Sequence, residues 1–345
     1  MNKLVLAKIG SDPELVFGEI KEWNQFLVPA DQLITKNRQK GLSAFIGTDG
    51  HMATAELRPT PAHNIRRHLF DIATALVTID DYLKDHKTRK NLVMIAQPFV
   101  KNEALGGHIH ISFFVNNPDI RDLLRYNYIY GTDSFVAFDR NSQASPPSMS
   151  LSKQMFAVEA LASVNRTPTP FVFVKVMNYL LRPFECWVQL WSSRISRNRL
   201  RASDGSHYGD EFDIRWLASE RPAMPKYHDW AYLHYEYRIP STWLTHPWLA
   251  YAYLALTKLV VLNYEKITEL VIVDHQRLTV TDVHPANDKF KDIFMERLAK
   301  VLSGSYKVTN DIEDLGHAIN IISENRLNWW SPAIGVFMKD WRELL

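Results

Sequence analysis

The stretch Gly106-Gly107-His108-Ile109-His110-Ile111-Ser112 decides the expected fold. Its polar and apolar residues alternate, which is typical of a β-strand with one buried face and one chemically active face. Because alternate side chains of a strand point to the same face, His108 and His110 should project together. The two glycines before them allow another backbone or a ligand to approach closely.

Three further predicted strands repeat this pattern of two reactive side chains separated by one apolar, aromatic or proline residue. Any single pair is common: a Glu-x-Arg pair is most often a surface ion pair, and two histidines are more often structural than joint ligands. Four pairs in one chain, three of them beside glycines, indicate a shared site on one face of a sheet. The other pairs are Asp12 with Glu14, Glu56 with Arg58, and Glu236 with Arg238, and Asp49 stands shortly before the second.

Carboxylates would crowd this face if the four strands lie side by side. Closely packed carboxylates raise one another's pKa values, and a divalent cation removes the conflict. Oxygen ligands suit Mg²⁺, and an imidazole slightly favours Mn²⁺. Because Mg²⁺ usually takes one or two carboxylates, we expect two or more ions, and the neighbouring arginines are suited to phosphate. The candidate metal ligands are the carboxylates of Asp12, Glu14, Asp49, Glu56 and Glu236, together with one imidazole, from His108 or His110.

The composition fits a large enzyme domain. The chain has 345 residues, 46% of them hydrophobic, and its formal net charge of +2 gives no sign of a nucleic-acid-binding surface. No signal peptide is recognised, and the longest apolar stretch, residues 248–262, is too short to span a membrane. The single cysteine, Cys186, is expected to pack in the core and favours a reducing compartment. We therefore predict a cytoplasmic protein with neither a membrane nor a nucleic-acid partner.

Hydrophobic periodicity predicts strands and helices that alternate along the chain. We expect one catalytic domain over residues 1–345, with the active-site strands within 1–241 and a mainly helical scaffold over 242–345. Residues 3–17 are predicted to form a strand interrupted at Pro13, and residues 192–226 look irregular. Further strands are predicted at 53–59, 92–96, 107–114 and 230–239, and helices at 62–85, 248–264, 287–302 and 311–324, with another beginning at 120–124.

At these stretches the sequence resembles the glutamine synthetase superfamily and, within it, the phage-type amidoligases, the type 2 group of COOH–NH2 ligases. The ordered set carries the resemblance rather than any one motif, and it spans roughly residues 10–241. The matching stretches are Gly10-Ser11-Asp12-Pro13-Glu14, Gly47-Thr48-Asp49-Gly50 with Glu56-Leu57-Arg58-Pro59, Gly106-Gly107-His108-Ile109-His110, Tyr208-Gly209 with Arg215, and Glu236-Tyr237-Arg238-Ile239-Pro240-Ser241.

The resemblance implies an α+β fold like the catalytic domain of glutamine synthetase. In such a fold a curved, mainly antiparallel sheet carries helices on its outer face, and the site lies on the concave face. The implied activity is an ATP-dependent carboxylate–amine ligase that forms an amide through an acyl phosphate, with ATP and Mg²⁺ or Mn²⁺ as cofactors. The implied substrates are a small-molecule or peptide carboxylate and an amine, in a bacterial or phage-infected cell.

The resemblance also distributes roles among the residues. It places the acidic pairs and Glu236 on metal, Arg238 on the transferring phosphoryl group, and one histidine of the pair on metal with the other near the substrate. Asp12 and Asp49 stand where glutamine synthetase itself has glutamate, and no counterpart of its N-terminal β-grasp domain is evident, so its ammonia site is not carried over. The catalytic candidates are Arg238, Arg58 and His110, and the nucleotide-binding candidates are Arg201, Tyr208, Gly209 and Arg215.

Two other functions stay open at this point. A metal-dependent hydrolase also uses a His-x-His strand and would act without ATP, and a non-catalytic protein could retain the fold. The sequence does not identify the acid and amine substrates or the oligomeric state, and a homo-oligomer is possible. It does not identify the general base either, for which Glu56, His110 and Asp210 are candidates.

Overall fold

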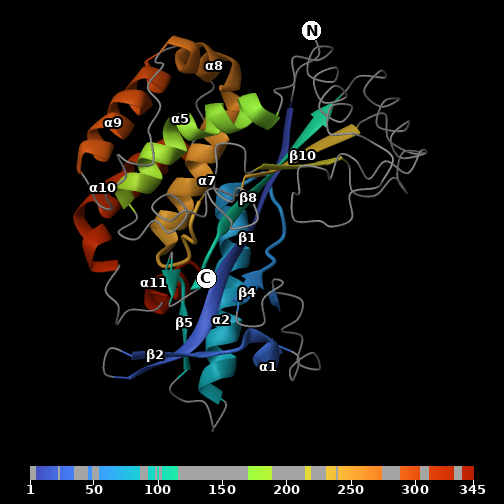
Figure 1. Cartoon of the computed structure of the whole chain (residues 1–345), viewed down its shortest axis with the longest axis vertical. Coiled ribbons are helices and arrows are strands. Elements are labelled where there is room, and N and C mark those ends of the chain that lie inside the picture. The colour runs from blue at the N-terminus through green and yellow to red at the C-terminus, as the bar shows by residue number, and fades with distance from the viewer. Residues whose placement is uncertain are drawn as a thin grey trace, which may run out of the picture.

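An antiparallel sheet and a group of helices lie side by side in this computed structural model (Figure 1). The sheet has the strand order β3-β4-β1-β8-β10-β9, and β2 and β5 also pair with β1. The structure describes residues 5–21, 24–34, 46–48, 54–85, 92–97, 99–100, 103–115, 170–188, 214–218, 231–237, 240–273, 288–303, 311–329 and 336–345.

The strands of the main sheet pair in an antiparallel sense throughout the described residues. A separate two-stranded sheet is formed by β6 and β7. The strands are β1 (Val5–Lys21), β2 (Asn24–Val28), β3 (Ile46–Thr48), β4 (Thr54–Leu57), β5 (Leu92–Ile95), β6 (Phe99–Val100), β7 (Glu103–Ala104), β8 (Gly107–Val115), β9 (Ile214–Ala218) and β10 (Ala231–Tyr237).

Strand β1 is the long central strand and changes partners along its length. Up to Pro13 it pairs with β8, and from Glu14 onward it pairs with β4, β5 and β2 in turn. The predicted interruption at Pro13 is wrong, because the strand is continuous through that residue. Proline cannot donate to a strand ladder, and Pro13 stands at the point where the pairing with β8 ends and the pairing with β4 begins.

Helices cover one face of this sheet. Ser11 of β1 shares a hydrogen bond with His68 of α2, and Tyr237 of β10 donates one to Asn178 of α5. Successive residues of a strand point to opposite faces, so Asp12 lies on the face away from α2. The helices are α1 (Ala30–Ile34), α2 (Ile65–Asp85), α5 (Pro170–Val188), α7 (Pro247–Leu262), α8 (Tyr264–Val273), α9 (Asp288–Leu302), α10 (Asp311–Trp329) and α11 (Met338–Arg342).

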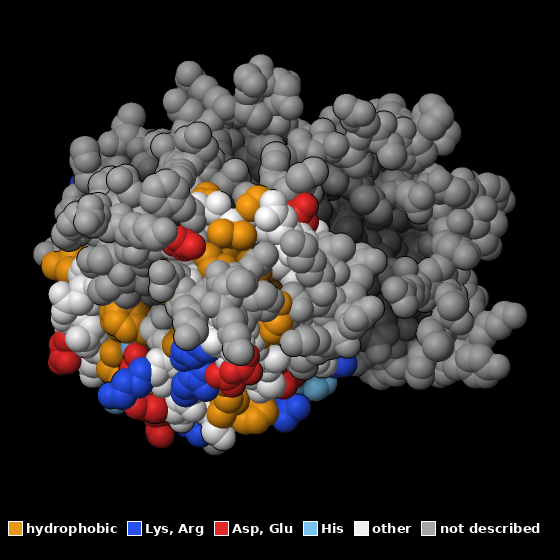
Figure 2. All heavy atoms as spheres, turned by 90° about the horizontal axis from the view of Figure 1, so that it is seen from below, with side chains coloured by type: hydrophobic (Ala, Val, Ile, Leu, Met, Phe, Trp, Pro, Cys, Tyr) orange, Lys and Arg blue, Asp and Glu red, His pale blue; other side chains and the backbone are white. Residues whose placement is uncertain are grey.

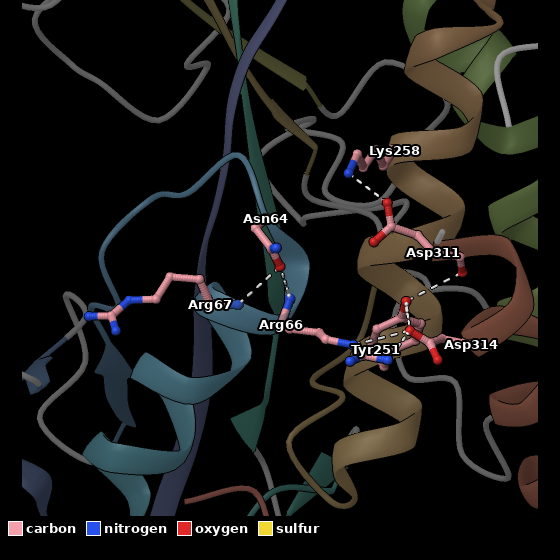
Figure 3. A network of polar contacts seen from close by, with 7 residues as sticks. All are labelled: Asn64, Arg66, Arg67, Tyr251, Lys258, Asp311 and Asp314. Carbon is pink, nitrogen blue, oxygen red and sulfur yellow. Dashed lines mark hydrogen bonds and ion pairs between the residues drawn. The ribbon is translucent and has the colours of Figure 1, made fainter. Parts of the chain in front are cut away.

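The helical layer is built around α7, whose residues are buried on nearly all sides. A polar network joins the beginning of α2 to α7 and α10 (Figure 3). In it Arg66 forms an ion pair with Asp314 at 2.6 Å, and Lys258 forms one with Asp311 at 2.6 Å. The hydroxyl of Tyr251 donates to Asp314 at 3.2 Å, so this network connects all three helices.

The α+β class, the antiparallel sheet and the outer helices are confirmed. The helix over residues 62–85 and the three helices predicted after residue 248 are present, although α7 ends at Leu262 and a separate helix, α8, follows. Several elements were not predicted, among them helix α5, and strand β9 within the stretch 192–226 that was expected to be irregular. The helix predicted to begin at 120–124 lies outside the described residues.

Basic and acidic side chains intermingle on the described part of the face in Figure 2, together with scattered apolar ones. This surface agrees with the near balance of charge in the sequence. Among the described helices, none has the length and apolar character needed to cross a membrane.

Candidate functional site

Strand register brings members of the four predicted pairs onto three adjacent rungs on one face of the sheet, and we call this group the polar row. Asp12 of β1 stands directly opposite His108 of β8, and the neighbouring Gly10 stands opposite His110. Directly opposed residues share a face of an antiparallel sheet. His110 also stands opposite Glu236 of β10, so residues far apart in sequence meet in adjacent positions.

The carboxylate of Asp12 lies between the two imidazoles. Asp12 Oδ1 is 3.3 Å from His108 Nδ1, and Asp12 Oδ2 is 3.1 Å from His110 Nε2. Burial by itself would raise the pKa of Asp12, but the Coulombic attraction and hydrogen bonding of His108 and His110 outweigh it and hold the pKa below its ordinary value. Asp12 is therefore an ionised carboxylate at neutral pH.

Glu14 is held in place by backbone groups. Its side chain is buried, with 4% of its surface exposed, and its Oε2 accepts a hydrogen bond from the N–H of Gly106. Its Oε1 lies 3.9 Å from His108 Nε2, which is too long for a hydrogen bond. Glu14 stands directly opposite Glu56 of β4, so the two carboxylate residues are cross-strand neighbours on the same face of the sheet.

Arg58 follows β4 and lies beside this pair. Its Nε is 3.6 Å from Glu56 Oε1, and more than half of its side chain is exposed. Its guanidinium group also lies over Gly47 of β3, the residue that pairs with Glu56. Glycine at position 47 leaves room for the guanidinium group, because a Cβ there would occupy the space that Arg58 fills.

Two further candidates are placed by register alone. Glu236 stands between His110 on β8 and Arg215 on β9, directly opposite both. The side chains of Glu236 and Arg215 lie outside the described part of the structure, as do residues Asp49, Arg201, Tyr208, Gly209, Asp210 and Arg238. The roles expected for these residues stay predictions.

The carboxylate and imidazole groups of this site are suitable ligands for a hard divalent cation, but the described residues do not form a complete coordination shell. Asp12 Oδ1 is buried, and its contact with His108 Nδ1, at 3.3 Å, is longer than an ordinary hydrogen bond, so a cation would stabilise this oxygen further. Within the described residues no group of three or more His, Cys, Asp or Glu side chains is arranged to hold a metal ion. The predicted ligand set also includes Asp49 and Glu236, whose side chains belong to the part that is not described.

Several contacts that shape this site were not predicted from the sequence. The N–H of Gly106 holds Glu14, and Thr242 Oγ1 donates to the Glu14 carbonyl at 2.7 Å. On the outer face His68 Nδ1 donates to the carbonyl of Thr60 at 2.9 Å, which leaves Nε2 to accept from the Ser11 hydroxyl at 2.8 Å. Burial lowers the pKa of His68, so the neutral ring ties β1 to α2 directly behind Asp12.

No protein-family model matches this sequence, and no curated protein matches it. Solved structures do align with nearly the whole chain. The complex between the prokaryotic ubiquitin-like protein Pup and its ligase PafA shares 11% identity over 97% of this chain and 66% of that chain, with a TM-score of 0.45. A novel glutamine synthase homolog shares 12% identity over 99% of this chain and 71% of that chain, with a TM-score of 0.40.

A bifunctional glutathione synthetase from Pasteurella multocida shares 10% identity over 98% of this chain and 51% of that chain, with a TM-score of 0.43. The chain therefore spans only part of the length of each of these proteins. At such identities and scores, nothing about activity, substrate or partner is carried from them to this chain.

Proposed function

We propose that this protein is an ATP- and metal-dependent ligase of the amidoligase type, which joins a carboxylate to an amine. The observation that carries the proposal is the register that sets Glu14 opposite Glu56, Asp12 opposite His108, and His110 opposite Glu236. These positions belong to the ordered stretches that resemble the amidoligases. Their meeting on neighbouring rungs of one face supports a common site better than four unrelated ion pairs would.

A bound cation would offset the charge of this row. Like charges directly opposite each other destabilise a sheet, and Glu14 with Glu56 is such a pair. When bound, divalent ions would neutralise charge on the phosphate oxygens of the nucleotide. The residues proposed to hold them are Asp12, Glu14, Asp49, Glu56, His108 and Glu236.

The proposed reaction has two steps. A carboxylate oxygen of the acid substrate attacks the γ-phosphorus of ATP, the bond to the bridging oxygen breaks, and ADP leaves. The amine nitrogen then attacks the acyl carbon, the bond to the phosphate oxygen breaks, and phosphate leaves while the nitrogen loses a proton. We assign phosphoryl contacts to Arg58 and Arg238, because arginine binds such groups through paired hydrogen bonds.

The remaining roles are assigned on the same basis. Arg201, Tyr208, Gly209 and Arg215 are proposed to bind the nucleotide. His110 is proposed to lie near the amine, where the carboxylate of Asp12, 3.1 Å from its Nε2, would orient the ring.

Ligand-induced stabilisation tests this function. Thermal unfolding is measured for wild type with Mg²⁺ or Mn²⁺ alone, ATP alone, and both together. A ligand at about 100 times its dissociation constant adds roughly 2.7 kcal/mol to the free energy of unfolding. We expect a stabilisation that needs both metal and ATP, and a release of ADP that depends on added acids and amines.

A matched pair of variants locates the effect. Asp12→Asn removes the charge from the proposed site, and Asp71→Asn makes the same change on α2, where Asp71 pairs with Arg67 at 3.2 Å. Only Asp12→Asn should abolish the stabilisation by metal and ATP. Stabilisation by metal alone, with hydrolysis of amides and no use of ATP, would instead identify a metal-dependent hydrolase, and no response to either ligand would leave a non-catalytic protein.

A further inference from the structure

A buried polar stripe runs along helix α5. Asn178, Arg182 and Glu185 are spaced four and three residues apart, so they share one side of the helix. Glu185 is 1% exposed and Asn178 is 8% exposed. Burying a carboxylate costs free energy unless it is hydrogen-bonded and balanced by a nearby cation. The hydrogen bonds that Glu185 accepts therefore indicate its structural role.

Glu185 and Asn178, at the two ends of the stripe, both bind the segment around the last residue of β10. Glu185 Oε1 accepts a hydrogen bond from the backbone N–H of Ser241 at 3.0 Å, and its Oε2 accepts one from the hydroxyl of Tyr253 on α7. Asn178 Oδ1 accepts a hydrogen bond from the hydroxyl of Tyr237 at 2.6 Å. Burial, together with the negative charge of Glu185, raises the pKa of Tyr237 well above its ordinary value, so this hydroxyl stays protonated and donates.

From these two anchors the contacts continue to the candidate site. Ser241 forms a bridge with Gly106, and the N–H of Gly106 holds the carboxylate of Glu14. Tyr237 is the residue after Glu236, which stands opposite His110. The stripe on the outer face is thus linked to Glu236 through Tyr237, and to Glu14 through Ser241 and Gly106.

We propose that Glu185 and Asn178 are positioning residues for the metal-binding row, acting through Ser241 and Tyr237 to fix Glu14 and Glu236. The proposal rests on the metal site of the proposed function, although not on its use of ATP. Each of the two residues sets the place of a backbone segment whose neighbours carry the predicted ligands, and groups that orient metal ligands in this way usually contribute about 10- to 100-fold to metal affinity.

A matched pair of tyrosine variants tests this role in the full chain. Tyr237→Phe removes the hydroxyl that Asn178 holds. Tyr251→Phe removes the hydrogen-bonded hydroxyl of another tyrosine with a buried side chain, at the network of Figure 3 and away from β10. Mn²⁺ binding is measured by calorimetry and stability by thermal unfolding. Both variants should lower the melting temperature by a few degrees, and only Tyr237→Phe should weaken Mn²⁺ binding, by about tenfold.

Two variants of Glu185 separate positioning from bulk packing. Glu185→Gln keeps an oxygen that accepts from the Ser241 N–H and should retain Mn²⁺ affinity within about threefold of wild type. Glu185→Leu removes that acceptor and should lose about tenfold or more. If Glu185→Leu does not fold, the comparison of the two tyrosine variants decides the matter.

The outcomes distinguish this proposal from the proposed function. Equal Mn²⁺ affinity in Tyr237→Phe and Tyr251→Phe would overturn the positioning role, whatever the enzyme does. Wild type that binds Mn²⁺ but not ATP would overturn the ligase function and leave the positioning role standing if Tyr237→Phe alone weakens the metal. Wild type that binds no Mn²⁺ would overturn both.

Discussion

The guanidinium group of Arg58 lies so close over Gly47 that a Cβ added to Gly47 would stand 2.3 Å from Arg58 Cζ. The collision involves the far end of a flexible side chain, so Gly47→Ala should displace the guanidinium group without unfolding β3. We expect a change of less than about 1 kcal/mol in the free energy of unfolding. Nucleotide affinity should fall as far as it does in Arg58→Ala, measured by calorimetry with ATP and Mg²⁺.

The two variants check each other. Gly47→Ala keeps the charge of Arg58 and alters only its place, whereas Arg58→Ala removes both. Wild-type affinity in Gly47→Ala together with a loss in Arg58→Ala would mean that Gly47 does not set the position of the arginine. Unchanged affinity in both variants would remove Arg58 from the proposed site.

We expect the buried ring of His246 to make the protein less stable in mild acid. Its Nδ1 accepts the N–H of Trp248 at 3.2 Å and thereby caps α7, and its ring stacks on Trp329 with centroids 4.2 Å apart. Burial lowers the pKa of His246 from 6.5 to about 4, against the opposing effect of Asp340. The ring is therefore neutral at pH 7, and its contact with Asp340 is no ion pair there.

Because the pKa of His246 is lower in the folded chain than in the unfolded chain, the free energy of unfolding should fall in mild acid. Above pH 6.5 the ring is neutral in both the folded and the unfolded chain, and as the pH falls toward 4 the unfolded chain takes up the proton first. We expect roughly 1–3 kcal/mol of the free energy of unfolding to be lost over this interval. Urea unfolding of wild type and of His246→Asn, which keeps a capping oxygen without a titrating ring, checks this. An equal pH slope in the two proteins would contradict it.

Replacing glycine by alanine should have opposite effects on stability at Gly107 and at Gly316. A Cβ on Gly107 would stand 2.5 Å from the carbonyl oxygen of Ser241 and 2.5 Å from the indole of Trp243, whereas a Cβ on Gly316 in α10 would meet nothing within 4 Å. Gly107→Ala should cost roughly 1–3 kcal/mol. Gly316→Ala should add about 0.5–1 kcal/mol, because alanine favours a helix interior. Urea midpoints of both variants measure this, and a neutral Gly107→Ala would contradict the close packing.

The packing of Cys186 predicts an unreactive thiol. It is fully buried, as the sequence indicated, and burial raises its pKa to about 12. At pH 8 only about one thiol in ten thousand would then be ionised, and the thiolate is the reactive form. Native protein should resist iodoacetamide and react once unfolded in guanidinium chloride, as followed by mass spectrometry. Rapid labelling of native protein would contradict the buried placement.

Local pattern predicted much of this fold and of the row. The i, i+2 pairs on β1 and β8 were readable because strand alternation is a local property, and the helix Ile65–Asp85 was readable from its apolar spacing. Helix α5 was missed because it carries Pro183 within it, and a proline is more often read as the boundary of a helix than as part of its interior. Strand β9 was missed because a short strand in a polar stretch has little signal of its own.

The register could not be predicted in the same way. That His110 faces both Gly10 and Glu236 depends on how three distant strands slide against one another, which no single stretch encodes. The contact between Glu185 and Ser241 could not be predicted either, because Glu185 lies in a helix that the sequence analysis did not identify. Pairing across long separations is where local sequence patterns carry least information.

The central place of β1 has a consequence for how the chain folds. β1 is made first, yet its partner β8 follows much later, and β10, which completes the row through β8, later still. Loops that close over such separations are entropically costly, so sheets of this topology fold slowly. Until β8 has been synthesised, β1 presents an unpaired edge, and until β10 has been synthesised, β8 does. Such edges can associate with other chains. Chaperone demand and aggregation during expression should therefore fall once synthesis has passed Tyr237.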